Sequence, residues 1–214
     1  MKKPKSKKKA KKGGIPSPFT DGWFGTDDPF SPKNIQPNKN DLYYDAMDMC
    51  GMGKAGARRA LQLLNRALEM DKDYIQTYVG LVSAHSAAGN KKKMEEAIKT
   101  AYEKTLKMFP KWPRRLEWGI LENRAPMRAI QYMADWHWDN GQKEKAAELF
   151  RLLLRLNPND NQGARYEIAA LYAGLSGSDV NRMTDEGNEK QNWDEMENLV
   201  KEQNARHKFW KEPK

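Results

Sequence analysis

Gly51, Gly53 and Gly56 have the GxGxxG spacing of a phosphate-binding loop, in which backbone amides between a strand and a helix hold a dinucleotide pyrophosphate. Residues 41–50, however, have the apolar spacing of a helix rather than of a strand. Ala55 also stands where a Walker A loop needs Ser or Thr. We therefore expect the three glycines to form a turn between two helices.

A second stretch, Asp135-Trp136-His137-Trp138-Asp139, has the residue types of a metal site. In a helix, residue i+2 points roughly opposite to residues i and i+4, so the histidine cannot join the two aspartates. Three histidines and one cysteine, Cys50, also form no HExxH motif, paired-cysteine motif or catalytic Cys-His or Ser-His-Asp set. We assign no catalytic residue, cofactor or metal, and expect that the protein is not an enzyme.

A helical pattern of 34 residues recurs three times, at 41–74, 75–108 and 127–160, with an insertion at 109–126. The third copy matches best. Two large apolar residues and a small one precede a turn glycine, and an alanine, an aromatic residue, a leucine and a proline follow it: Ile130, Met133, Ala134, Gly141, Ala146, Phe150, Leu153 and Pro158. This pattern resembles the tetratricopeptide repeat (TPR). The resemblance implies an all-α, TPR-like solenoid of helical hairpins, whose stability needs about three stacked copies.

The flanks of the repeats predict capping elements. Residues 161–175 have a single apolar stripe and predict a capping helix, whereas 176–192 are polar and punctuated by glycine, which predicts a linker. A C-terminal helix is expected over 193–214, with Asn192 as its cap and Glu195 completing a capping box. His85 and His137 occupy corresponding places in two repeats, which favours packing or hydrogen bonding for both. His207 is expected to lack partners.

The insertion contains three prolines, Pro110, Pro113 and Pro126, which predict breaks between helices. It also contains Trp112, Leu116, Trp118 and Ile120, which are too apolar for a free loop, so we expect the insertion to fold back on the repeats. The alternative is an exposed Trp112 that, beside Arg114 and Arg115, stacks nucleobases or binds an acidic peptide.

The net charge of +9 comes almost entirely from residues 1–12, which we expect to form a disordered arm. Such an arm binds nucleic acid or anionic lipid without sequence preference, acts as a nuclear localisation signal, or only aids solubility. The lysines of the arm are Lys2, Lys3, Lys5, Lys7, Lys8, Lys9, Lys11 and Lys12.

Residues 13–40 are expected to form an irregular segment that contains Phe19, Trp23, Phe24 and Phe30. This segment either caps the first hairpin, docks in the groove or binds another protein.

In tetratricopeptide proteins the first helix of each pair lines a concave groove for peptides, and the resemblance implies the same groove here. The positions beside the packing stripe of these helices are Asp45, Met49, Gln76, Val79, Ser83, Arg128, Gln131, Asp135, Trp138 and Arg165. The carboxylate clamp of chaperone-binding members looks absent, since the first copy offers Asp45 and Met49. The set suits a mixed-charge peptide with an apolar anchor, unless Trp138 packs against the insertion.

We therefore expect a non-catalytic protein–protein interaction module or adaptor that binds a peptide or a partner helix. The alternative is an RNA- or ribosome-associated factor that binds through the lysine arm, and a regulator or subunit of an enzyme is a third possibility. No apolar run of signal-peptide or membrane-spanning length is present, and one cysteine makes no internal disulfide. These features predict a cytoplasmic protein, or a nuclear one in a eukaryote.

Overall fold

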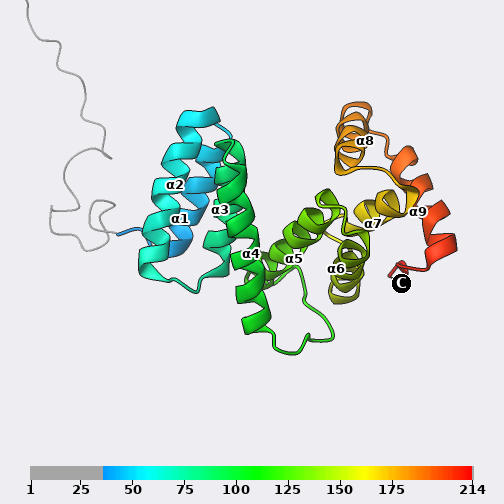
Figure 1. Cartoon of the computed structure of the whole chain (residues 1–214), viewed down its shortest axis with the longest axis horizontal. Helices are drawn as coiled ribbons and strands as arrows, with labels where there is room; N and C mark the ends of the chain where they lie inside the picture. Colours follow the sequence, from blue (N-terminus) through cyan, green and yellow to red (C-terminus); the bar gives the residue numbers. More distant parts are fainter. Residues whose placement is uncertain (1–35, 214) are drawn as a thin grey trace, which may run out of the picture. The chain divides into compact units, whose positions relative to one another are not determined.

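The computed structural model describes residues 36–213, and this part of the chain is all-helical. The helices of the described residues all lie in the unit Asn38–Lys214, and consecutive helices pack in adjacent pairs, as the solenoid prediction requires (Figure 1). The helices are α1 (Lys39–Cys50), α2 (Gly53–Met70), α3 (Ile75–Ala87), α4 (Lys91–Met108), α5 (Leu121–Asp139), α6 (Lys143–Leu156), α7 (Ala164–Ala173), α8 (Gly177–Lys190) and α9 (Asp194–His207).

Three hairpins, α1–α2, α3–α4 and α5–α6, form the body of the unit, and each contacts the next. Second helices touch the following first helices, and α3 also touches both α1 and α5. The first helices therefore lie next to one another, which is the arrangement that creates a shared face. Among the described residues, no helix is both long and apolar enough to cross a membrane.

The predicted glycine turn joins α1 to α2. Gly51 caps α1, and Gly53 has a φ of +68°, a conformation that costs glycine little. A Cβ on Gly56 would lie 2.2 Å from the Met49 carbonyl oxygen, so only glycine lets α2 start this close to α1. The GxGxxG spacing thus serves a helical hairpin, without the strand that a dinucleotide site requires.

The core divides along the chain. Tyr43, Leu64 and Ile98 belong to a cluster in the first two hairpins, while Phe150 and Ile168 belong to a larger one in the C-terminal half. Alanines at the helix contacts, Ala60, Ala67 and Ala101, are fully buried, so helices approach closely there. Each cluster joins neighbouring hairpins, which is how a repeat array buries apolar faces that one hairpin cannot bury alone.

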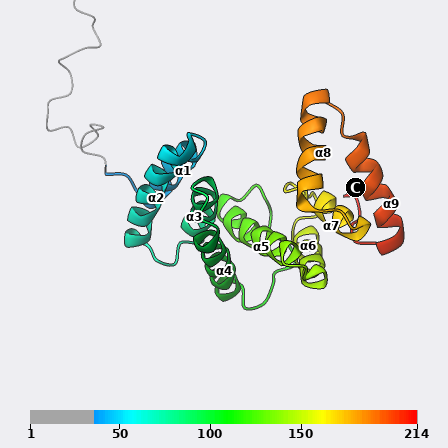
Figure 2. The ribbon, with the colours of Figure 1, turned by 45° about the horizontal axis from the view of Figure 1, so that its top comes forward.

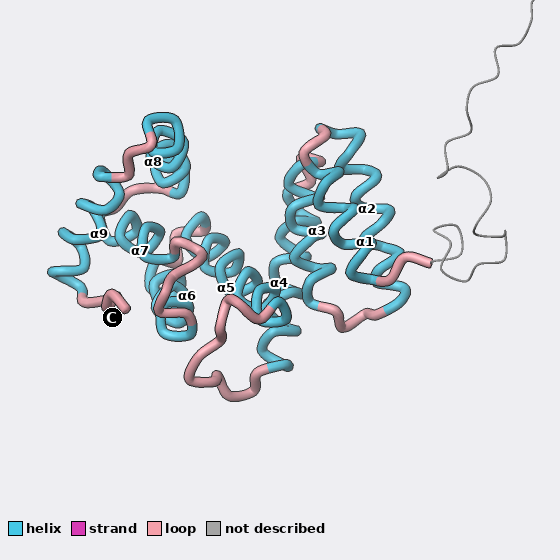
Figure 3. Tube along the Cα trace, turned by 180° about the vertical axis from the view of Figure 1, so that it is seen from behind, coloured by secondary structure: helices cyan, strands magenta, loops and turns pink. Residues whose placement is uncertain are grey.

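The insertion is shorter than the sequence predicts, because α5 starts at Leu121 and contains Pro126. The expectation that Pro126 breaks a helix is wrong. Pro126 is the sixth residue of α5, so the helix loses only the hydrogen bond to the carbonyl of Glu122. Glu122 is exposed, whereas Pro126 itself is fully buried. The remaining loop, shown in pink between α4 and α5 in Figure 3, is pinned by the Leu116 amide, which donates to the Leu156 carbonyl at 2.8 Å.

The prediction of a linker at 176–192 is also wrong, because α8 occupies most of it. Its start has a capping box in which the Ser176 and Asp179 side chains each accept from the other's backbone amide. Val180 and Met183 are buried, and a Cβ on Gly187 would lie 2.7 Å from the Trp193 ring. Helix α8 packs on both α7 and α9, so tertiary contacts stabilise a segment with little apolar periodicity (Figure 2).

The C-terminal helix differs from the expected one at both ends. It starts at Asp194 with Trp193 at the cap position, and the Asn192 side chain accepts only from the Asp194 amide, so the predicted box with Glu195 is not formed. It ends at His207 rather than at residue 214. At the opposite end of the unit, α1 begins two residues before the predicted repeat, capped by Asn38. The lysine arm at 1–12 and the aromatics of 13–35 lie outside the described residues.

Residues 208–213 leave α9 and fold back toward α6. Phe209 is buried, and Trp210 exchanges backbone hydrogen bonds with the Asn204 side chain at 2.8 and 2.9 Å. The Trp210 indole also donates to the Pro158 carbonyl at 3.1 Å. This C-terminal segment is therefore part of the folded unit, where the sequence predicts more helix.

Candidate peptide-binding groove

Two adjoining cavities of about 330 and 230 Å³ lie at the start of α3, between α1 and α5. They share four lining residues, Tyr44 of α1, Gln76 of α3, and Leu121 and Ala125 of α5. We call the combined depression the first-helix groove, because all three helices are the first members of their hairpins. It lies where the tetratricopeptide resemblance places a peptide groove.

Large apolar side chains rim this groove and are open to solvent. Tyr44, Met108 and Leu121 are 51%, 53% and 54% exposed, respectively. Tyr43 packs edge-on against Tyr44, with ring centroids 5.2 Å apart, and so fixes the direction of the exposed ring. Small Ala125 lines both cavities, which leaves room for an incoming side chain. Exposed apolar groups that line one depression are typical of an interaction site.

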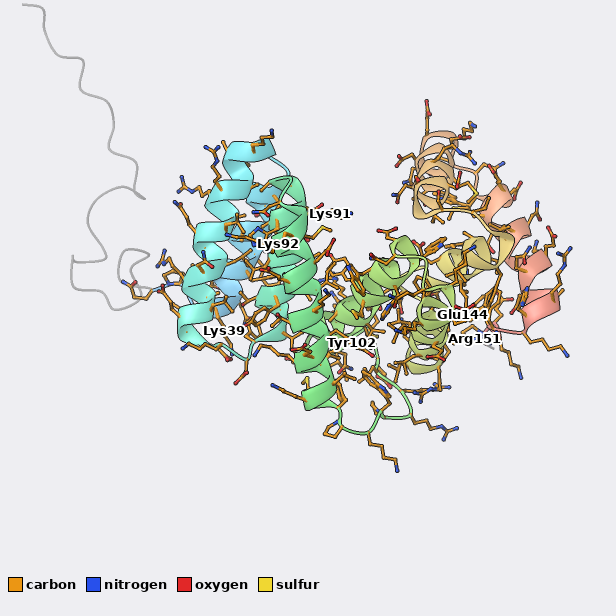
Figure 4. All side chains as sticks on the ribbon, in the orientation of Figure 1. Lys39, Lys91, Lys92, Tyr102, Glu144 and Arg151 are labelled. Atoms are coloured by element: carbon orange, nitrogen blue, oxygen red, sulfur yellow. The ribbon has the colours of Figure 1, made fainter. Side chains whose placement is uncertain are left out.

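One end of the groove has acidic residues whose charges are mostly paired. Asp71 accepts from Lys39 at 2.6 Å, and Asp73 accepts from Lys104 at 2.7 Å. The hydrogen bond from Lys39 is the main reason that the pKa of Asp71 lies below its ordinary value. Figure 4 labels Lys39, which lies at the start of α1. Glu122 also lines this end and forms no ion pair within residues 36–213.

Tyr74 provides a neutral hydrogen-bonding group at the acidic end. Its hydroxyl contacts the Asn40 amide oxygen and donates to the Gln76 side-chain oxygen at 2.9 Å. Burial, followed by the neighbouring Tyr44 and Tyr43, raises the Tyr74 pKa to about 12. The phenol therefore keeps its proton at physiological pH and helps to orient Gln76 on the groove floor.

The other end of the groove is basic. Arg124 and Arg128, one turn apart on α5, both stack over Trp118 of the insertion, at 5.2 and 5.5 Å from its ring centroid. Arg124 also donates to the Trp118 carbonyl at 2.9 Å, and Arg128 approaches the Tyr43 hydroxyl at 3.5 Å. Neither guanidinium has a carboxylate partner among residues 36–213. The insertion thus holds two cations at the groove edge while their charges remain available.

Of the predicted groove residues, Gln76 and Arg128 line the observed groove. Val79 and Trp138 do not, because both are buried; Trp138 is only 8% exposed and packs edge-on against Phe150. The alternative that Trp138 packs in the core with residues of the insertion fits its cluster, which includes Leu116.

The remaining predicted groove residues lie away from the cavities. Asp45 is exposed and Met49 half-buried on α1, while Ser83 lies 3.4 Å from the Tyr132 hydroxyl. Gln131 accepts from Gln162 at 2.6 Å, so its amide is already used inside the fold. These side chains are on the first helices, as expected, but none of them lines either cavity.

Arg165 is a structural residue rather than a groove cation. Its guanidinium pairs with Asp160 at 3.0 Å and with Glu197 at 3.1 Å, and it stacks on Tyr166 and Trp210. These contacts join α7, α9 and the C-terminal segment. The sequence pattern placed Arg165 beside the packing stripe but could not reveal Glu197 and Trp210 as partners, since both come from the distant segment predicted as a C-terminal helix.

Asp135 belongs to a group of carboxylates between α5 and α7. Burial, then Glu167 and Asp139, raise the Asp135 pKa well above its ordinary value. Burial, then Asp139 and Asp160, raise the pKa of Glu167 to about 7. Asp135 lines neither cavity of the groove, and its burial beside other carboxylates disfavours its charged form.

The histidines have packing and hydrogen-bonding roles. Burial lowers the pKa of His85, and His137 places its Nδ1 2.8 Å from the Gln142 side-chain oxygen. His207 does have a partner, contrary to expectation, since its ring stacks on Tyr172 at 4.0 Å.

Sequence reasoning missed the residues that make the groove distinctive, above all Tyr44, Leu121 and Arg124. Two signals for these groove residues were available in the sequence. One was the adjacent pair Tyr43 and Tyr44, and the other was the pair Arg124 and Arg128, spaced i and i+4 on α5. The arginine pair was obscured because the predicted third copy begins at 127, six residues after the start of α5. Comparison with protein-family models, curated proteins and solved structures finds no match for this chain.

Proposed function

We propose that this protein is a non-catalytic, TPR-like interaction module that holds a peptide of a partner protein in the first-helix groove. The observation that carries the proposal is the exposed set of Tyr44, Met108 and Leu121, from α1, α4 and α5, around one groove. The single cysteine of the chain is compatible with a reducing cytoplasmic or nuclear compartment.

The charges around the groove define the ligand further. Asp71 and Asp73 already have lysine partners, whereas Arg124 and Arg128 have no carboxylate partner in the described chain. A bound peptide gains most by supplying a carboxylate to the arginines, because guanidinium groups bind carboxylates in a fixed, bidentate geometry. The expected ligand therefore has a bulky apolar side chain for the cavity beside Leu121 and an acidic residue next to it.

A displayed library of random peptides, selected against the full-length protein, tests this proposal. The expected consensus is one large apolar residue adjacent to an acidic residue. Leu121→Asp should weaken the selected peptide by about 30-fold or more, since loss of an interface anchor costs about 2 kcal/mol or more. Arg128→Gln should weaken it about tenfold, as expected when one charge-assisted hydrogen bond of about 1.5 kcal/mol is lost.

Leu106→Asp is the matched control. Leu106 is 40% exposed on α4 and lines neither cavity, so the same change in charge and size should leave peptide binding unaltered. Thermal unfolding of each variant shows whether the fold is intact. Selection of no consensus, or equal weakening by the two aspartate substitutions, would refute a groove-based function.

A further inference from the structure

A cavity of about 660 Å³ lies away from the first-helix groove, between α6 and the C-terminal segment. Four cationic residues line it: Arg115 from the insertion, Arg151 and Arg155 from α6, and Lys211 from the C-terminal segment. Figure 4 labels Arg151 on α6. Three segments far apart in sequence thus bring positive charge to one depression.

These charges are not neutralised by the surrounding fold. None of the four residues forms an ion pair within residues 36–213, and Glu212 is the one acidic side chain in the lining. Arg151 donates to the Tyr172 hydroxyl at 3.1 Å and to the His207 carbonyl at 3.0 Å, which are neutral partners. Arg155 has a single long contact, 3.4 Å to the Pro113 carbonyl. Like charges gathered without counterions favour an anionic ligand.

The aromatic ring among these cations favours a nucleic acid over an acidic peptide as that ligand. Three of the four cations are arginines, whose planar donors fit phosphate oxygens, and Arg151 and Arg155 follow one another at i and i+4 along α6. The Trp210 indole lies in the same lining, and stacking on aromatic rings is the sequence-tolerant contact used by proteins that bind single strands. We propose that this cavity binds the backbone of a single-stranded nucleic acid.

This site is independent of the lysine arm. The arm lies outside the described residues, whereas the cavity takes its cations from α6, the insertion and the C-terminal segment. A strand bound there would cross α6 next to the C-terminal segment, with phosphates at the arginines and a base near Trp210. Binding through folded, spaced cations is the arrangement expected of a nucleic-acid site, and one that the charge distribution of the sequence alone did not indicate.

Fluorescence anisotropy with a labelled 12-nucleotide single-stranded RNA and the full-length protein tests the site. The triple variant Arg115→Gln/Arg155→Gln/Lys211→Gln removes three exposed cations and leaves Arg151, which supports the fold. Each phosphate contact with a single strand contributes about 0.7 to the slope of log affinity against log salt. Loss of three contacts should therefore lower the slope by about 2 and weaken binding by about 100-fold at 0.1 M salt.

The matched control is Arg58→Gln/Arg59→Gln/Arg66→Gln on α2, which removes the same charge from exposed positions outside every cavity named above. It should keep the affinity and salt slope of the wild type, as should Leu121→Asp. Equal losses in both triple variants, or no loss in either, would overturn the proposal and assign RNA binding to the arm. Displacement of the RNA by polyglutamate as readily as by unlabelled RNA would overturn it in favour of an acidic peptide.

Discussion

Replacing Glu167 with glutamine should stabilise the protein at neutral and alkaline pH. Glu167 lies in the first turn of α7, and the residues that face it include Asp139 of α5 and Asp160 of the preceding loop. Asp135 of α5 is a third carboxylate that interacts with it. Arg165, the cation next to Asp160, is already bonded to both Asp160 and Glu197. Ionised Glu167 is therefore partly desolvated and surrounded by like charge.

The magnitude follows from the Glu167 pKa of about 7 in the fold, compared with an ordinary value of 4.5. Below pH 4.5 the carboxyl is protonated in both the folded and the unfolded chain. Between 4.5 and 7 the unfolded chain releases the proton first, so the free energy of unfolding falls as pH rises. At about 1.4 kcal/mol per pH unit, the loss by pH 8 is about 3 kcal/mol.

Glutamine has nearly the shape of the protonated glutamate and carries no charge at any pH. Glu167→Gln should therefore match the wild type at pH 4 and exceed its free energy of unfolding by about 3 kcal/mol at pH 8. Urea unfolding followed by circular dichroism at both pH values measures this difference. The control Glu148→Gln alters an exposed residue of α6 and should stay within about 0.5 kcal/mol of the wild type. A variant no more stable than the wild type at pH 8 would refute the reasoning.

Three further substitutions test the packing and the helix starts, and urea unfolding measures each of them. Gly56→Ala should destabilise the first hairpin by about 1–3 kcal/mol, since its Cβ would overlap the Met49 carbonyl. Its control, Gly51→Ala, should be nearly neutral, because a Cβ at Gly51 meets nothing within 4 Å. Phe150→Ala should cost about 3–5 kcal/mol, because the ring is fully buried in the larger core cluster; a loss below 1 kcal/mol would contradict that packing. Ser176→Ala should cost about 1 kcal/mol by removing the cap of α8, and an unchanged stability would mean that the capping box is not formed.

The hairpins were predictable because their signals are local. Apolar stripes with helical spacing, glycines at turns and alanines at contacts all lie within one 34-residue copy, and the observed pairs follow that order. Helix α8 was missed because its few apolar residues, Val180 and Met183, are buried by α7 and α9 rather than arranged in a long stripe. Its Ser176–Asp179 capping box was the one local signal available.

Only Gln76 and Arg128 of the predicted groove residues line the observed cavities. First helices do line these cavities, yet α3 buries Val79 between neighbours, and Trp138 packs on Phe150. Which side of a helix stays open depends on how the next hairpin packs, and on the insertion that places Trp118 under Arg124 and Arg128. Such contacts join residues distant in sequence, so periodicity alone does not determine them.

The most direct test of the central proposal is a titration of the ¹⁵N-labelled full-length protein with the peptide obtained by selection, followed through backbone amide shifts. A peptide in the first-helix groove should produce saturable shifts at Tyr44, Gln76, Leu121, Arg124 and Arg128, and Leu121→Asp should abolish them. Saturable shifts confined to other residues, such as those around Arg155 and Lys211, would contradict the assignment of peptide binding to this groove.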